Sequence, residues 1–181
     1  MKKHLAPRHN TNKEKTLESF FEQGKAEQDA IDPKNMLAYT SPRSYYWAGN
    51  EPDIQAAYLF ARAGRPDLTA RWVRWIEDTF YAASPAGVPG NDDGGTMSAW
   101  LVFSSLGFYP IVGSDRYVLG VPRFQKVEIT VPAGGVFTIQ VDGPPGGELA
   151  GVTLDGAPAG PEITQAQIKA GSVLQFHLRS P

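Results

Sequence analysis

The spacing of apolar residues changes once along this chain, near Gly113, and this change limits the folds that the chain can adopt. Before Gly113 the apolar residues recur with the period of an α-helix. After it they recur at about every second position, as in a half-buried β-strand. A run of helices followed by a run of strands is typical of α+β proteins. We therefore expect a helical region over residues 1–112 and a small antiparallel β-sheet or sandwich over residues 113–181.

The helical region begins with two weaker segments. Residues 14–30 have a polar helical pattern with few apolar positions. A second helix is expected to begin at Pro52, because proline fits the first turn of a helix, and Asn50 is a plausible cap just before it. Gly64 is expected to end this helix.

Two further segments carry stronger helical patterns. Pro66 begins the first of them, and apolar residues recur along one face of it as far as Phe80. The second runs from Thr96 to Leu106, and Gly107 is placed as its C-terminal stop. Because this last segment is apolar on most sides, we expect it to be buried.

The second part of the chain alternates between short strands and turns. Alternating apolar residues predict strands around Ile129, Ile139 and Phe176, and glycine and proline clusters mark the turns between them. The acidic residues of this part fall in turns, where solvated carboxylates are usual. We interpret this part as a packing module without a catalytic cluster.

The composition excludes several kinds of function. The chain has 17 Lys and Arg residues against 19 Asp and Glu, so nothing indicates a nucleic-acid partner. No segment approaches the roughly 20 apolar residues of a membrane span, and the basic start lacks the apolar core of a signal peptide. Cysteine is absent, and none of the three histidines (His4, His9 and His177) is placed for a metal site or a catalytic triad. Catalytic chemistry must therefore rest on carboxylates, and the compartment is not predicted.

Residues 89–100 form the first candidate site, because two acids lie between glycines just before a predicted helix. Glycine lets the backbone approach a ligand closely. The N-terminus of a helix stabilises ionised carboxylates, as a general base or a calcium ligand requires. The alternative is structural: Asp93 caps the helix and Asp92 points to water.

Residues 45–53 form the second candidate site. Asn50 and Glu51 offer oxygen ligands at a helix entrance, and Tyr45, Tyr46 and Trp47 offer flat apolar faces of the kind that sugars bind. The alternative is a helix cap followed by aromatic residues that belong to the core.

Two long motifs give the chain a resemblance to a known family. GNDDGGTMSAWLVFSSLGFYPIVGSDRYVLGVPRF (residues 90–124) closely resembles the C-terminal signature of the α-mannosidases of glycoside hydrolase family 92. GNEPDIQAAYLFARAGRP (residues 49–66) resembles the GNEP segment that precedes it in that family. The resemblance covers the chain from about Tyr45 to its end, whereas residues 1–44 match loosely.

The resemblance implies a fold and an activity. Members of this family are exo-acting, calcium-dependent α-mannosidases that invert the anomeric centre and act on mannose-containing oligosaccharides. They combine an N-terminal β-sandwich with an (α/α)6 barrel. Residues 1–112 would then be part of the barrel-type catalytic region, and residues 113–181 a C-terminal β module.

The resemblance also implies roles for the acidic loop and its partners. Asp93 corresponds to the general base, and Asn91 stands where it can orient the attacking water. Calcium would contact oxygens of Asn50 and Asp93, with water and sugar hydroxyls completing its shell.

Three further residues are candidates for contacts with the sugar: Trp47, Glu51 and Asp92. The linkage that the enzyme accepts does not follow from these residues.

The general acid of the family is a glutamate well before the GNEP segment, and no residue of this chain matches it. We therefore expect a C-terminal fragment of the enzyme that carries the base and metal side of the site. Its missing partner is the upstream part with the β-sandwich, and the fragment alone is expected to be inactive. The alternative is an inactive carbohydrate- or calcium-binding remnant.

Overall fold

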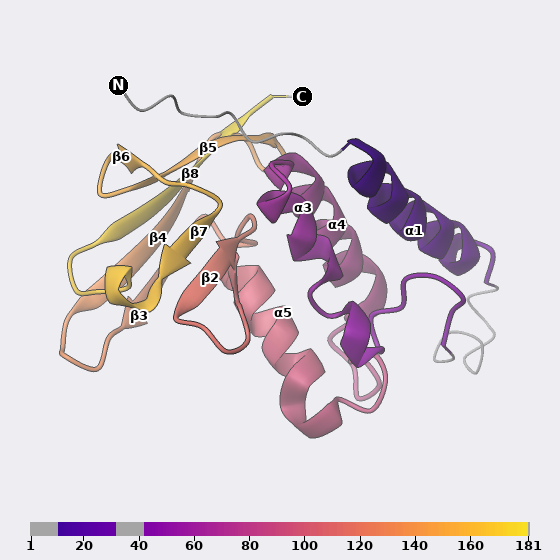
Figure 1. The fold of residues 1–181 in the computed structure, drawn as a ribbon. Coiled ribbons are helices and arrows are strands. Elements are labelled where there is room, and N and C mark those ends of the chain that lie inside the picture. The colour runs from indigo at the N-terminus through magenta and orange to yellow at the C-terminus, as the bar shows by residue number, and fades with distance from the viewer. Residues whose placement is uncertain (1–10, 32–41, 181) are drawn as a thin grey trace.

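The computed structural model describes residues 11–31 and 42–180 as an α+β protein with two small sheets. The helices lie on one side and the strands on the other, and helix α5 reaches toward the strands (Figure 1). His4 and His9 lie outside the described residues. The helices are α1 (Thr11–Asp29), α3 (Leu59–Arg62), α4 (Pro66–Phe80) and α5 (Thr96–Leu106), with 3-10 turns η1 (Glu51–Asp53), η2 (Ala56–Tyr58), η3 (Asp93–Gly95) and η4 (Gln165–Gln167).

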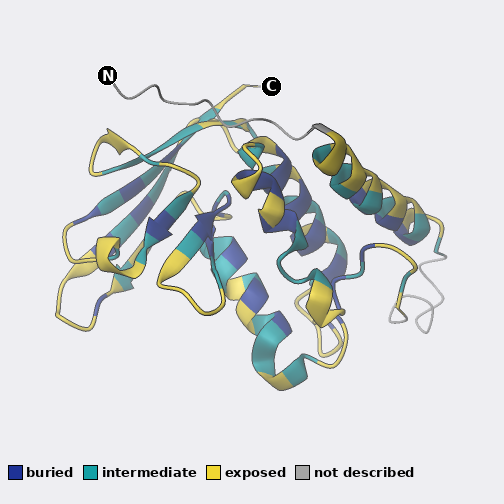
Figure 2. Ribbon diagram, viewed as in Figure 1, coloured by how far each residue is buried: buried dark blue, intermediate teal, exposed yellow. Residues whose placement is uncertain are grey.

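Helix α4 forms the centre of the helical part, as its apolar spacing predicts. Trp72 and Ile76 on its inner face are each 1% exposed, and Figure 2 shows buried positions along that face. Helix α1 packs against α4 through Phe21. The ring of Phe21 stacks on Trp72 at 5.0 Å and on Tyr46 at 4.5 Å. Tyr46 therefore belongs to the core.

The continuous helix expected from Pro52 to Gly64 is wrong: η1, η2 and the single turn of α3 replace it. The reason is a side chain from α4. The Thr69 hydroxyl donates to the Ala57 carbonyl at 2.8 Å and accepts the Ala61 amide at 2.9 Å. An α-helix would join those two backbone groups directly, so the hydroxyl replaces a helical hydrogen bond.

Helix α5 begins and ends as predicted, and Gly107 caps it with φ of 90°. The expectation that it is buried on most sides is wrong. Met97, Trp100 and Ser104 are buried, whereas Val102 is 58% exposed. Helix α5 therefore carries more apolar residues than the described part of the chain buries.

The first sheet has three antiparallel strands in the order β1–β2–β7, namely β1 (Phe108–Pro110), β2 (Arg116–Leu119) and β7 (Glu162–Thr164). Ile163 and Leu119 face the core beside Phe137 and Phe176 of the second sheet.

The second sheet has the order β3–β4–β8–β5–β6. Its strands are β3 (Lys126–Thr130), β4 (Val136–Asp142), β5 (Glu148–Leu154), β6 (Ala157–Pro158) and β8 (Val173–Arg179). The expectation of a purely antiparallel sheet is wrong at one pair, because β4 and β8 are parallel. Strand β8 is inserted between β4 and β5 and pairs antiparallel with β5.

Candidate active site

The two candidate loops meet at a pair of glycines. A Cβ atom on Gly49 would lie 2.8 Å from the backbone nitrogen of Gly90, and one on Gly90 would lie 2.9 Å from the carbonyl oxygen of Gly49. Real Cβ atoms do not approach other atoms this closely, so both positions require glycine. The segment with Asn50 and the segment with Asp92 and Asp93 are therefore in backbone contact.

Trp100 makes a second connection between the loops. Its indole Nε1 donates to the carbonyl of Ile54 at 2.9 Å, and Tyr81 stacks on its ring at 5.6 Å. The Tyr81 hydroxyl donates to the carbonyl of Met97 at 3.0 Å. Burial raises the pKa of Tyr81, which keeps this hydroxyl a donor. The start of α5 is thus fixed against the first loop.

The backbone of the acidic loop is strained. Asp92 has φ of 59° and Asp93 has φ of 38°, and Gly94 and Gly95 follow with φ of 71° and 93°. A non-glycine residue in this left-handed region costs about 1–2 kcal/mol. Strain of this kind gathers at functional sites, where surrounding contacts hold it in place.

The two adjacent aspartates have different surroundings. The Asp92 carboxylate accepts the Ser98 amide at 2.8 Å and the Ser98 hydroxyl at 2.9 Å. It therefore satisfies a free N–H in the first turn of α5. The structural alternative, with Asp93 as the cap and Asp92 in water, is wrong in that assignment.

Asp93 keeps its carboxylate available. Within residues 11–31 and 42–180, the hydrogen bond found at Asp93 involves its main-chain carbonyl, which accepts the Thr96 hydroxyl at 2.7 Å. A Cβ atom built on Gly94 or Gly95 would meet nothing within 4 Å, so the loop beside Asp93 is open. Asn91, two positions before Asp93, is exposed.

Asn50 lies in a tight turn at the start of η1, and it is exposed. It occupies the N-cap position as predicted, but its side chain makes no cap hydrogen bond to the backbone. The amide nitrogen Nδ2 instead donates to the carboxylate of Asp53 at 3.0 Å. Burial raises the pKa of Asp53, against the hydrogen bonds from Asn50 and Trp47, which lower it.

The other predicted sugar contacts are divided between two places. Glu51 is exposed next to Asn50. Trp47 is half-buried and lines a cavity of about 240 Å³ together with Tyr81 and Gly90. Asn50, Glu51, Asp92 and Asp93 do not line that cavity. The two loops are therefore joined through their backbone, but Trp47 lines a separate cavity.

Asn50 and Asp93 offer oxygen donors, which are the kind of ligand that a hard cation takes. Calcium takes six to eight oxygen ligands. No group of three or more His, Cys, Asp and Glu side chains gathers to hold a metal in the part of the chain that the structure describes. Two protein side chains would leave most positions to water or to the hydroxyls of a substrate.

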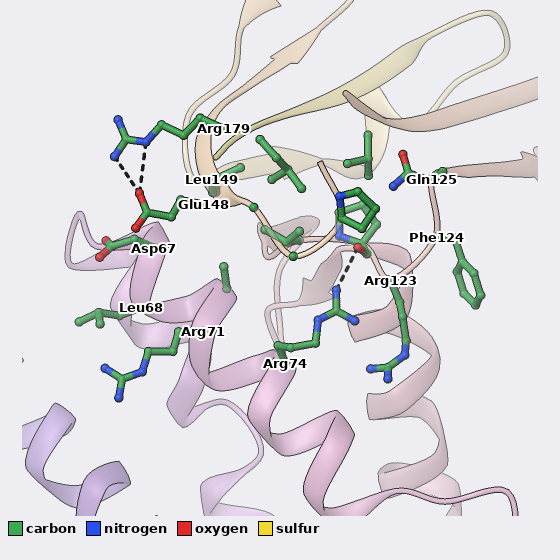
Figure 3. Close-up of a pocket in the computed structure, with 18 of the residues that line it drawn as sticks. Asp67, Leu68, Arg71, Arg74, Arg123, Phe124, Gln125, Glu148, Leu149 and Arg179 are labelled. Carbon is green, nitrogen blue, oxygen red and sulfur yellow. Dashed lines mark hydrogen bonds and ion pairs between the residues drawn. The ribbon is translucent and has the colours of Figure 1, made fainter. Parts of the chain in front are cut away.

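A larger cleft of about 870 Å³ lies between α4 and the turn before β5 (Figure 3). Five arginines line it: Arg65, Arg71, Arg74, Arg123 and Arg179. Each is already bound to a carboxylate of the chain, as Arg179 is to Glu148 at 3.1 Å. None of the predicted site residues lines this cleft.

Sequence reasoning missed Asp53 and Ser98, which hold Asn50 and Asp92 in place. Asp53 stands three residues after Asn50, a spacing that brings side chains together across one turn. Ser98 stands at the third position of α5, where helix caps find their backbone partner. The spacing of Asn50 and Asp53 could be recognised in the sequence, whereas Asp92 lies six residues before Ser98, outside the usual cap spacing.

A model of the glycosyl hydrolase family 92 catalytic domain matches residues 8–180. Together with the two joined loops, this match defines the class: the chain belongs to glycosyl hydrolase family 92. The resemblance of the two motifs is thereby confirmed.

Three solved structures share this architecture. The α-mannosidase BT3965 of Bacteroides thetaiotaomicron in complex with mannoimidazole is 28% identical, has a TM-score of 0.75, and is aligned over 93% of this chain and 22% of its own. The family 92 inverting mannosidase BT2199 of the same organism is 31% identical, with a TM-score of 0.67, over 81% of this chain and 20% of its own. The family 92 glycosyl hydrolase ccman5 is 28% identical, with a TM-score of 0.68, over 75% and 22%.

A curated relative matches a shorter segment of the chain. An uncharacterized secreted glycosidase of Arthroderma benhamiae is 35% identical over 99 residues, which are 55% of this chain and 13% of that protein. The matched part of the chain thus covers between 13% and 22% of the length of these relatives. Among the described residues, no helix has the length and apolar character needed to cross a membrane.

Proposed function

We propose that this chain supplies the water-activating and calcium-binding side of an inverting exo-α-mannosidase. The observation that carries the proposal is the contact of Gly49 with Gly90, which joins the loop of Asn50 to the loop of Asp93. Support comes from the solved relatives, of which one is an inverting mannosidase and another holds mannoimidazole. The substrate class is therefore a terminal α-mannoside of an oligosaccharide.

Asp93 acts in this proposal as the general base. An inverting glycosidase needs a carboxylate that takes a proton from the attacking water. The Asp93 carboxylate suits this task because it lies in an open loop. It is also not needed to cap α5, because the Ser98 amide donates to Asp92. Asn91 orients the same water, and its amide cannot take up the proton.

Asn50 and Asp93 would hold the calcium ion, through Oδ1 of Asn50 and a carboxylate oxygen of Asp93. When bound, calcium would supply positive charge that orients the sugar hydroxyls and the water. Glu51 and Asp92 are proposed to contact the sugar beside it. For Asp92, such a contact would use the lone pairs that Ser98 leaves free.

Trp47 is proposed as an apolar sugar contact from the neighbouring cavity. Its ring lies against Gly49, since a Cβ there would meet the indole at 2.5 Å. The part of the ring that lines the 240 Å³ cavity is the part that a second sugar could reach.

The proton-donating acid is proposed to come from outside these residues. Among the glutamates of α1, Glu18 and Glu22 bind Arg71 at 3.6 and 2.6 Å. Glu27 accepts the backbone amides of Ser44 and Tyr45 at 3.1 and 3.3 Å. Because the contacts of these three glutamates are structural, we assign the acid to an upstream segment with a β-sandwich, which would complete the site. Residues 1–112 would then be part of an (α/α)6 barrel, with residues 113–181 as its β module.

A hydrolysis assay tests this division of the site. The 181-residue chain, incubated with an α-mannobiose and calcium, should release no mannose, because general acid catalysis contributes about 10²–10⁴-fold. Measurable release that Asp93→Asn abolishes would contradict the placement of the acid. An inactive carbohydrate- or calcium-binding remnant is the second candidate. It predicts that no mannose is released even when the upstream part of the enzyme is added, so that Asp93→Asn has no activity to lower.

A further inference from the structure

Asp53 closes the turn that carries Asn50. Its Oδ2 atom accepts both the side-chain amide of Asn50 at 3.0 Å and the backbone amide of Trp47 at 3.4 Å. Two backbone bonds support the same turn: the Asn50 amide donates to the Trp47 carbonyl at 3.1 Å, and the Asp53 amide donates to the Asn50 carbonyl at 2.9 Å. Residues 47–53 are therefore held by four hydrogen bonds, two of which end on one carboxylate.

This contact determines which end of the Asn50 amide faces outward. An asparagine amide has an acceptor oxygen and a donor nitrogen, and rotation by half a turn exchanges them. A carboxylate accepts hydrogen bonds and donates none, so Asn50 must turn Nδ2 toward Asp53. The Oδ1 atom of the exposed Asn50 side chain then points away from Asp53.

The orientation matters for a metal ligand. Calcium binds oxygen, and an amide nitrogen presented in its place is not a ligand. Partners that fix the orientation of a metal ligand are as much part of a metal site as the ligand itself. Asp53 is half-buried and its Oδ2 is bound to two groups of its own turn, whereas the Asn50 side chain is exposed.

We propose that Asp53 is the positioning residue of the calcium site: it holds the amide of Asn50 so that Oδ1, and not Nδ2, is presented to the ion. The inference rests on the proposed function for the identity of the ion. The orientation of the amide itself rests on the hydrogen bonds alone.

The test compares Asp53→Ala with Asp53→Asn in the 181-residue chain. Calcium chloride is titrated in, and binding is followed by NMR, which also reports the side-chain NH₂ signals of Asn50 without metal. Asp53→Ala should weaken calcium binding about tenfold or more, the usual effect of losing such a partner. It should also shift the Asn50 NH₂ signals. Asp53→Asn keeps a carbonyl acceptor and should restore most of the affinity.

Asp155→Ala is the matched control, because Asp155 also accepts one side chain and one backbone amide, from Ser172 and Val173, at 3.0 and 2.8 Å. It should lower stability without changing calcium affinity. Equal calcium affinity for Asp53→Ala and the unmodified chain, or unchanged Asn50 NH₂ signals, would overturn the role of Asp53 and leave the calcium site intact. No calcium binding by the unmodified chain would overturn the calcium site itself.

Discussion

Gly49 and Gly90 are in backbone contact, with the position for a Cβ on Gly90 only 2.9 Å from the carbonyl oxygen of Gly49. This contact joins two loops that lie 41 positions apart and carry every predicted site residue. The candidate site therefore depends on a pair of residues that have no side chains.

Gly90→Ala should separate the two loops. The substitution adds a methyl group to a closed contact, and overpacking of this kind costs about 1–3 kcal/mol. Gly94→Ala is the matched control, because Gly94 also has a positive φ, of 71° against 66°, but meets nothing within 4 Å. Urea unfolding of both variants measures the difference. Equal losses of stability would show that left-handed backbone strain, and not the contact, accounts for the effect.

Asp92→Ala and Asp93→Ala should separate stability from binding. Asp92 satisfies the first turn of α5 through Ser98, so its loss should lower stability by about 1 kcal/mol, as for other helix caps. Asp93→Ala should change stability less and calcium affinity more. Thermal unfolding with and without calcium measures both, and a larger loss of stability for Asp93→Ala would reverse the assignment.

Thr69→Val should destabilise the segment between η1 and α4. The hydroxyl of Thr69 bridges the Ala57 carbonyl and the Ala61 amide, and valine leaves both buried groups unpaired. The expected cost is about 1–3 kcal/mol. Thr69→Ser keeps the hydroxyl and should retain most of the stability. Hydrogen exchange at the Ala61 amide reports the change locally, and slow exchange in the valine variant would contradict the account.

Glu77 should make stability depend on pH. Its side chain is 1% exposed and contacts Arg123 at 2.9 Å and Arg74 at 3.3 Å. Burial raises its pKa despite these arginines. A carboxyl whose pKa is higher in the folded state than in the unfolded state favours folding while protonated, so its contribution is lost as pH rises through the folded pKa.

The substitution Glu77→Gln removes this titration. The free energy of unfolding of the variant relative to the unmodified chain should therefore increase as pH rises from about 4.5 upward. Denaturant unfolding at several pH values measures it. A difference that decreases with rising pH would mean that the two arginines outweigh burial.

The sequence predicted those parts of the fold that depend on local periodicity. Helix α4 follows from its own apolar face and α5 from its start and stop residues. The breaks between Pro52 and Gly64 depend on Thr69 and on Trp100, which act from other elements. Local propensity does not include such contacts.

The candidate site likewise has features that follow from local sequence and features that do not. The two loops could be found from their glycines, acids and aromatic residues. The assignment of the helix contact to Asp92 and the open position to Asp93 could not, because both acids precede the same helix and have similar neighbours in sequence. Backbone conformation, with both residues at positive φ, directs one carboxylate to Ser98 and leaves the other open.

The most direct test of the central claim is a calcium titration of the 181-residue chain and of Asp93→Asn, followed residue by residue by NMR. Calcium should shift signals in residues 45–53 and 89–98 together, and Asp93→Asn should weaken these shifts at both loops. Calcium shifts confined to other parts of the chain, or an affinity that Asp93→Asn leaves unchanged, would contradict it.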